Sequence, residues 1–300
     1  MSDKPVSHVT RPLDAAAAAL VVLICLSWGF NQVSVKLAIH DIPPLTQGML
    51  RSVGATLLVA AWCKWRGMPL FARDGTLVTG LLTGTLFGLE FVLIYQGLAY
   101  TTATRAVLFI YLAPFFVVLG TRIFLPADRF GPAQWLGLTL SFAGMMVAFG
   151  APTPALDPRQ TVGDLMMVAA AIAWAATTLM IKTSRLNRIS SEKVMLYQLV
   201  VSIPMLGIGA WIFGDRVQHL PSALAIGALA YQTIWVVSVT FVIWFALVVR
   251  YSANRLSAFS FLTPLFGVAA GHFVLGEPMT PAFAAAVALV ALGLVLVNRR

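Results

Sequence analysis

Residues 105–115 read RAVLFIYLAPF, and residues 255–265 read RLSAFSFLTPL, 150 positions further along the chain. Each stretch begins with an arginine and has a phenylalanine four residues later and a proline nine residues later. Each also lies inside a longer apolar run, where a proline removes one backbone donor and bends a helix. The pair therefore predicts two related helices, each bent near its centre, in two copies of one structural unit.

A slightly different offset extends the repeat to the first apolar run. It pairs Trp28 with Trp174 and Lys36 with Lys182. Chance similarity between helices rich in Leu, Ala and Phe is the alternative, but the shared Arg-to-Pro spacing and the matched lysines argue against it. We expect residues 1–150 and 151–300 to be two five-helix repeats, with residues 152–158 as the linker between them.

The composition excludes an ordinary soluble domain. Apolar residues make up 59% of the chain and charged residues 10%, and the mean hydropathy is +0.88, whereas soluble domains are roughly half apolar and a quarter charged. Apolar runs long enough to cross a bilayer recur from end to end. The sequence therefore predicts an all-α membrane protein of about ten transmembrane helices, at residues 14–39, 43–63, 75–99, 103–124, 130–149, 161–182, 192–213, 222–249, 254–275 and 280–298.

The basic residues predict the orientation of these helices. The net charge is +9, but Lys and Arg occur singly or in small groups between apolar runs, which favours anionic lipid headgroups over nucleic acid as partner. With the N-terminus inside, only Lys36, Arg105, Arg159 and Arg216 fall on the outer side, and Arg51 lies within a helix. Both termini are thus expected in the cytoplasm. Because each repeat has an odd number of helices, the second repeat is expected to be inverted relative to the first.

Four short motifs carry a family resemblance: SWGFN at 27–31, YLAP at 111–114, FLTP at 261–264 and LGEP at 275–278. With them, nearly the whole chain resembles the ten-helix EamA-type branch of the drug/metabolite transporter superfamily. Within that branch it is most similar to bacterial exporters of aromatic and other amino acids. The resemblance implies a multi-pass protein of the bacterial inner membrane that moves a small amino acid substrate by alternating access, as a monomer or weak oligomer. One departure is LPAD at 125–128, where the second repeat has the more typical Gly-Glu.

Polar and aromatic residues inside the predicted helices are the candidates for a substrate cavity. Glu90 is the only carboxylate deep in a predicted helix, and an intramembrane ionisable group is costly enough to suggest function. The repeat places Thr240 at the position that matches Glu90, and Thr83 and Glu90 share one face of their helix. The predicted cavity residues are Trp28, Asn31, Gln32, Thr83, Glu90, Tyr95, Tyr111, Trp174, Thr178, Gln232, Trp235, Thr240 and Ser260. As a set they suit a flat, partly apolar substrate, although each one alone could equally fill the core or bond a neighbouring helix.

Glu90 has a competing structural explanation. Arg51 is expected at a similar depth in the second helix, so the two could form a buried ion pair. The position that matches Arg51 in the second repeat lies near Val200, which is apolar. The sequence leaves both roles open for Glu90.

The matched prolines, Pro114 and Pro264, are candidates for paired hinges in the fourth and ninth helices. A static bend that only shapes packing is the alternative. Cys25 and Cys63 lie in apolar runs without metal-ligand spacing, so no disulfide, metal site or cofactor is expected.

The favoured function is export of amino acids and related small metabolites through a central cavity. Efflux of cationic aromatic drugs or quaternary ammonium compounds is the alternative, with Glu90 as counter-charge and the tryptophans as cation–π partners. An intramembrane enzyme is not expected, because His8, His40, His219 and His272 form no catalytic motif. A channel is disfavoured because rings of charge and a repeated filter sequence are missing.

The orientation can be tested with reporter fusions. Fusions after Arg66, Arg188 and Arg300 should report the cytoplasm, and a fusion near Asp157 should report the periplasm, because basic loops are retained inside. A change of side anywhere in the second half would contradict the inverted repeat.

Overall fold

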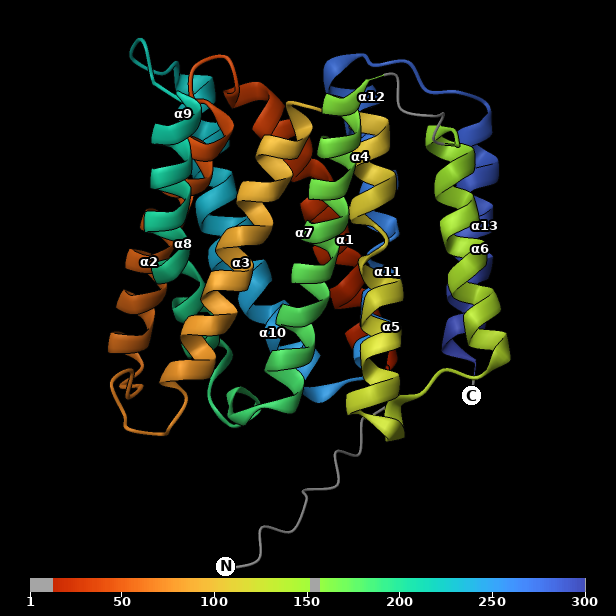
Figure 1. Cartoon of the computed structure of the whole chain (residues 1–300), viewed down its shortest axis with the longest axis horizontal. Helices are drawn as coiled ribbons and strands as arrows, with labels where there is room; N and C mark the ends of the chain where they lie inside the picture. The colour runs from red at the N-terminus through yellow and green to blue at the C-terminus, as the bar shows by residue number, and fades with distance from the viewer. Residues whose placement is uncertain (1–12, 152–156, 300) are drawn as a thin grey trace, which may run out of the picture.

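The computed structural model describes residues 13–151 and 157–299, and every regular element in this part of the chain is helical. Most of the predicted linker at 152–158 lies outside the described residues. Eight helical stretches are long and apolar enough to cross a membrane, and α2, which contains Arg51, and the shorter apolar α13 bring the total to ten. The helices stand side by side, with the start of α1 and the end of α13 on one face, here called the terminal face (Figure 1).

The predicted set of ten spans is confirmed, with bounds that differ by a few residues. The spans are α1 (Ala15–Ala38), α2 (Pro44–Trp65), α3 (Leu77–Leu98), α4 and α5 (Ala103–Ile110, Ala113–Phe124), α6 (Pro132–Phe149), α7 (Pro158–Thr183), α8 (Ser191–Phe213), α9, η3 and α10 (Ala223–Ala230, Tyr231–Thr240, Phe241–Arg250), α11 and α12 (Ala253–Phe259, Leu262–Leu275) and α13 (Ala282–Asn298). Short 3₁₀ turns, η1 (Pro126–Asp128) and η2 (Arg185–Arg188), occur between spans.

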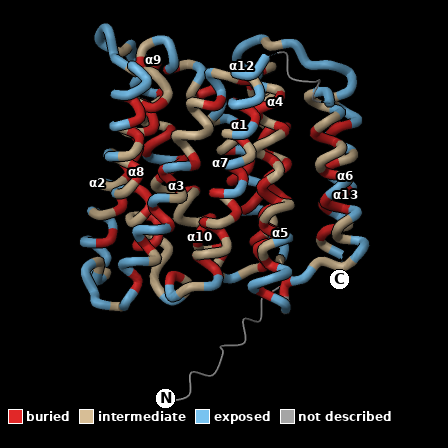
Figure 2. Tube along the Cα trace, viewed as in Figure 1, coloured by how far each residue is buried: buried red, intermediate tan, exposed pale blue. Residues whose placement is uncertain are grey.

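The surface of the helix bundle is apolar, as a bilayer requires. Large apolar side chains such as Leu57, Ile123, Leu165 and Trp211 are mostly exposed, and exposed segments run along the outer helices as well as the loops (Figure 2). In water this surface would be an aggregation site, whereas in lipid it is solvated. The chain is a multi-pass membrane protein.

Side-chain caps begin several helices. The carboxylate of Asp14 accepts from the backbone N–H of Ala17 at 2.8 Å at the start of α1, and Asp157 accepts from Gln160 N–H at 2.8 Å at the start of α7. Such caps satisfy first-turn donors that have no partner within the helix. Thr102 and Ser252, which the repeat matches, cap α4 and α11 in the same way.

The fourth and ninth spans break at matching places. The α-helix ends at Ile110 and resumes at Ala113, one residue before Pro114, and it ends at Phe259 and resumes at Leu262, two residues before Pro264. Each proline lacks the N–H that would continue the ladder to the preceding turn. Both spans are therefore interrupted next to the matched prolines, and bending or motion about these positions stays a prediction.

The eighth span differs from the continuous α-helix expected at 222–249. Residues Tyr231–Thr240 form a π-helix, in which the N–H of Phe241 bonds the carbonyl of Val236. β-branched side chains crowd this stretch, and the hydroxyl of Ser238 donates to the carbonyl of Thr233 at 2.7 Å, which favours a wider turn. Wide turns of this kind often occur at functional sites.

The helix packing follows a pseudo-two-fold pattern. α2 packs on α8 and α6 on α13, each a pair of repeat counterparts. α3 packs on α7 and α8, and its counterpart span α9–α10 packs on α1 and α2. The hydroxyl of Ser202 donates to that of Ser52 at 3.0 Å, and these residues match at the offset of 150. A residue can contact its own counterpart only near the symmetry axis, so the axis passes between α2 and α8.

The α6–α13 pair is packed through small residues. A Cβ added to Gly137 would lie 2.5 Å from the carbonyl oxygen of Gly293, and one added to Gly293 would collide with Ser141 and with the backbone at Gly137. Small residues let membrane helices approach until van der Waals contacts between backbones hold them together.

The close approach of α6 and α13 predicts that one methyl group added at their contact destabilises the protein. Gly293→Ala should lower the free energy of unfolding by about 1–3 kcal/mol, the usual cost of overpacking. Gly227→Ala is the control, because a Cβ at that helical glycine meets nothing within 4 Å. Thermal unfolding in detergent should show a lower melting temperature for Gly293→Ala alone. Equal melting temperatures for both variants would contradict the packing described here.

Candidate functional site

A row of aromatic rings links three spans in the interior. Trp28 of α1 lies 4.9 Å from Phe241 and 5.2 Å from Trp244, measured between ring centroids. Phe87 of α3 is edge-on to Phe241 at 5.9 Å and to Phe91 at 4.9 Å. We call these five residues the aromatic row. Phe91 and Phe241 match in the repeat, so the row passes from one repeat to the other.

One predicted pair of cavity residues is bonded directly. The indole N–H of Trp28 donates to the hydroxyl of Thr240 at 2.8 Å, and Thr240 donates to the carbonyl of Val236 at 2.6 Å. Trp28 is thereby fixed in position within the aromatic row, between Trp244 and Phe241.

A second aromatic group lies around the break in the fourth span. Tyr111 is 6.0 Å from Trp174 and 6.3 Å from Phe261, and Phe115 is edge-on to Phe142 at 5.5 Å. Tyr111 and Trp174, both predicted for the cavity, thus lie together. No ring contact joins this group to the aromatic row within the described residues.

Several other predicted cavity residues make local hydrogen bonds. The hydroxyls of Thr83, Thr178 and Ser260 donate to backbone carbonyls of their own helices. The amide of Gln232 donates to Gln47 at 2.9 Å and ties η3 to α2.

Trp235 and Gln32 are exposed. The indole N–H of Trp235 donates to Ser27 at 2.9 Å and joins η3 to α1. Contacts of this kind occur in helix packing as well as in binding surfaces.

Glu90 and Arg51 are both buried, and neither has a hydrogen-bond or ion-pair partner in the described part of the chain. The side chain of Arg51 is 3% exposed, and its guanidinium lies over the ring of Phe91 at 4.2 Å and near Tyr95 at 6.0 Å. Glu90 is 9% exposed. Within residues 13–151 and 157–299 neither forms a hydrogen bond or an ion pair within 4.0 Å, and the Nε of Arg51 is a buried donor without an acceptor. The two side chains therefore form no direct ion pair within 4.0 Å, although Arg51 still acts electrostatically on Glu90.

Unbonded polar atoms also occur at matched positions of α1 and α7. The side-chain oxygens of Asn31 and Thr177 are buried and have no hydrogen-bond partner among the described residues. The offset that pairs Trp28 with Trp174 pairs these two as well. Asn31 was expected from the sequence, whereas Thr177, Phe87, Phe91 and Phe241 were not. The repeat offset would have found Thr177 and the Phe91–Phe241 match.

The matched lysines have different partners. Lys182 is buried, and its ammonium group donates to the carbonyl of Val248 at 2.8 Å and to that of Tyr251. Lys36 is exposed and pairs with Glu277 at 2.7 Å. The end of α10 is thus fastened to α7 at the terminal face, and α10 packs on α7 there.

At matched positions, residues of the eighth and ninth spans near the terminal face are more buried than their counterparts in the third and fourth spans. Val248 is fully buried, but its counterpart Leu98 is 44% exposed, and Ala253 is buried where Ala103 is exposed. The eighth and ninth spans are therefore packed more tightly at the terminal face than the third and fourth spans are at the opposite face.

The LPAD departure has a structural role at the terminal face. The carboxylate of Asp128 accepts from the hydroxyl of Ser252 at 2.5 Å and from the N–H of Ala253 at 3.0 Å. Asn254 donates to the carbonyl of Asp128. Burial raises the pKa of Asp128, and these hydrogen bonds partly oppose that effect. The turn in the first repeat thus fastens the start of α11.

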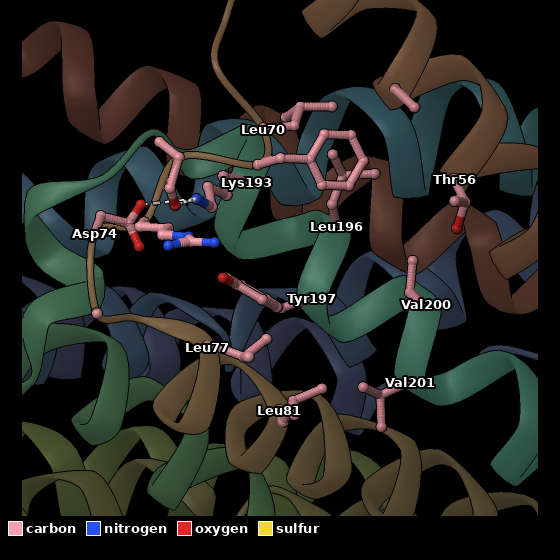
Figure 3. Close-up of a pocket in the computed structure, with 15 residues that line it drawn as sticks. Thr56, Leu70, Asp74, Leu77, Leu81, Lys193, Leu196, Tyr197, Val200 and Val201 are labelled. Atoms are coloured by element: carbon pink, nitrogen blue, oxygen red, sulfur yellow. Dashed lines mark hydrogen bonds and ion pairs between the residues drawn. The ribbon is translucent and has the colours of Figure 1, made fainter.

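A separate pocket of about 590 Å³ lies between α2, α3 and α8 near the terminal face (Figure 3). Leu196, Val200 and Val201 of α8 line it, and Lys193 pairs with Asp74 at one end at 2.7 Å. Hydrogen bonds from Lys193 and Thr76 lower the pKa of Asp74 to about 2. None of the predicted cavity residues lines this pocket.

The chain is similar to known proteins over nearly its whole length. A model of the EamA-like transporter family matches residues 15–150 and 161–299. The uncharacterized transporter YvbV of Bacillus subtilis is 27% identical, over 94% of this chain and 92% of its own. A probable amino-acid metabolite efflux pump of Salmonella typhimurium is 24% identical over 92% of each chain. A solved crystal structure with a TM-score of 0.78, which is 22% identical and covers 94% of this chain and 96% of its own, has the same fold.

Proposed function

This chain belongs to the EamA-like transporter family, and from that membership we propose that it is a secondary transporter exporting aromatic and other neutral amino acids. Relatives from Salmonella typhimurium and Escherichia coli carry the name of probable amino-acid metabolite efflux pumps. The observation that carries the proposal is the aromatic row, which runs from Trp244 through Trp28 to Phe91. The ring of Phe91 lies against the guanidinium of Arg51, and Phe91 follows Glu90 in the sequence. Rings next to unpaired opposite charges suit a substrate that is flat and zwitterionic.

The proposed mechanism is alternating access between the two repeats. Its support is the difference between matched lysines, because Lys182 closes on the end of α10 while Lys36 binds Glu277 instead of the end of α3. In an inverted repeat, the opposite state arises when the two halves exchange these arrangements. The structure then corresponds to the state closed at the terminal face.

The basic residues support placing the terminal face in the cytoplasm of a bacterial cell, so that the more loosely packed face is periplasmic. A substrate leaving toward that face would move in the direction of export.

Efflux of cationic aromatic compounds is the second candidate, because Glu90 is an unpaired buried carboxylate. Arg51, however, lies close enough to act electrostatically on Glu90. A substrate with only a positive charge would meet that guanidinium as a like charge in a medium of low polarity. The arrangement favours a substrate that carries both charges.

Counterflow in proteoliposomes tests the function. Purified protein should exchange radiolabelled tryptophan in a saturable way, and phenylalanine should compete, whereas threonine should compete weakly and a quaternary ammonium ion should not. Replacing Trp28, Trp174 and Trp235 together by alanine should reduce counterflow roughly tenfold or more, because each aromatic contact with the substrate contributes about 0.5–1.5 kcal/mol.

Trp211→Ala is the matched control, because Trp211 is 78% exposed on the outer surface. It should keep wild-type counterflow. Unchanged counterflow in the triple variant would exclude these tryptophans from the cavity, and competition by the quaternary ion alone would replace amino acid export with drug efflux.

A further inference from the structure

We propose that Arg51 and Glu90 form a zwitterion receptor, in which Arg51 binds the α-carboxylate and Glu90 binds the α-ammonium group of the substrate. The inference rests on the proposed function and adds to it the residues that separate α-amino acids from amines and from N-acylated acids. It is carried by two side chains that are more than nine-tenths buried and unbonded in the described structure.

The two charges come from helices that meet mainly through a third. α2 carries Arg51 and packs chiefly on α8, whereas α3 carries Glu90 and packs on both α7 and α8. The axis contact between Ser52 and Ser202, one residue from Arg51, anchors α2 to α8 at this level. The scaffold thus holds opposite charges near each other and more than 4.0 Å apart.

Leaving such charges unpaired is unfavourable, because buried ions without partners lose their hydration and gain little in return. A direct ion pair would remove this cost if the helices allowed it. A solute with both charges can also remove it. In an α-amino acid the ammonium nitrogen and the carboxylate carbon are about 2.5 Å apart by standard bond geometry, so one molecule can bridge the two side chains.

The guanidinium of Arg51 is already oriented for such a contact. Phe91 covers one face of the guanidinium group at 4.2 Å. The edge of the guanidinium, which carries the unbonded Nε, is left for an acceptor. Two parallel N–H donors on such an edge match the two oxygens of a carboxylate. Phe91 is also the end of the aromatic row, so an aromatic side chain bound through its α-carbon at this point would lie among rings.

The receptor exists in one repeat only. The position that matches Glu90 is Thr240, which accepts from Trp28, and the position that matches Arg51 lies in the apolar stretch around Val200. One substrate orientation per protein follows from this asymmetry.

Binding of four solutes to the solubilised full chain tests the receptor: tryptophan, tryptamine, N-acetyltryptophan and serine. Thermal stabilisation and competition against labelled tryptophan are the readouts. In the wild type, tryptamine and N-acetyltryptophan should bind at least about tenfold more weakly than tryptophan, because each leaves one buried charge unpaired. Serine should stabilise the protein measurably.

Two single substitutions test which charged group of the substrate each side chain binds. Arg51→Gln should abolish the preference for tryptophan over tryptamine, and Glu90→Gln the preference for tryptophan over N-acetyltryptophan. Arg122→Gln, which removes an exposed arginine of α5, should keep both preferences. If either single variant is not monodisperse, Arg51→Lys or Glu90→Asp replaces it, and a shortened but charged side chain should weaken tryptophan binding while keeping the order of preference.

Four outcomes overturn the receptor. One is equal binding of all three indoles by the wild type, and another is a preference that survives both substitutions. The third is a melting temperature that falls in each single variant and recovers in the double variant with unchanged preferences, since Arg51 and Glu90 would then only stabilise each other. If serine and other small amino acids stabilise the protein but tryptophan is not transported, the receptor stands and aromatic export fails. If no amino acid stabilises it, both fail.

Discussion

The structure depends on one constraint, the cost of an unbonded backbone group in hydrocarbon. It makes every span a helix and confines irregular backbone to places where another element covers it. The breaks before Pro114 and Pro264 and the π-helix at Tyr231–Thr240 are the exceptions within spans. All three lie in the fourth, eighth and ninth spans rather than in the α6–α13 pair. The proposed alternating access would use these departures from regular helix.

The same cost applies to side-chain charges and distinguishes Arg51 and Glu90 from the rest. Arg105 pairs with Asp164, Lys193 with Asp74 and Lys36 with Glu277. Each of these pairs lies near one end of a span, where it fastens neighbouring helices or loops. Arg51 and Glu90 lie deeper and form neither a hydrogen bond nor an ion pair in the described residues, so these two charges are available to a ligand.

Much of the fold could be predicted because its signals are long and repeated. Twenty-residue apolar runs identify spans, and Pro114 and Pro264 identify breaks. The site was less accessible to prediction. Phe87 and Phe91 are apolar residues in an apolar helix, so nothing in the sequence marks them as site residues. The depth of Arg51 and Glu90 in the membrane could be predicted, but not the direction in which each side chain points. That direction decides whether the two side chains form an ion pair or stay apart. The wide helical turns at Tyr231–Thr240 depend on local crowding between side chains, which the periodicity of apolar residues does not reveal.

The most direct test of the receptor is a distance within the bound state. The chain has three glutamates, so solid-state NMR on protein labelled with ¹³C at Glu Cδ and loaded with ¹⁵N-amino tryptophan in liposomes can isolate Glu90 by difference from Glu90→Gln. Charge-assisted N–O contacts of about 2.8 Å should give strong dipolar dephasing that disappears in the variant. Saturating tryptophan with no dephasing that depends on Glu90 would contradict the account.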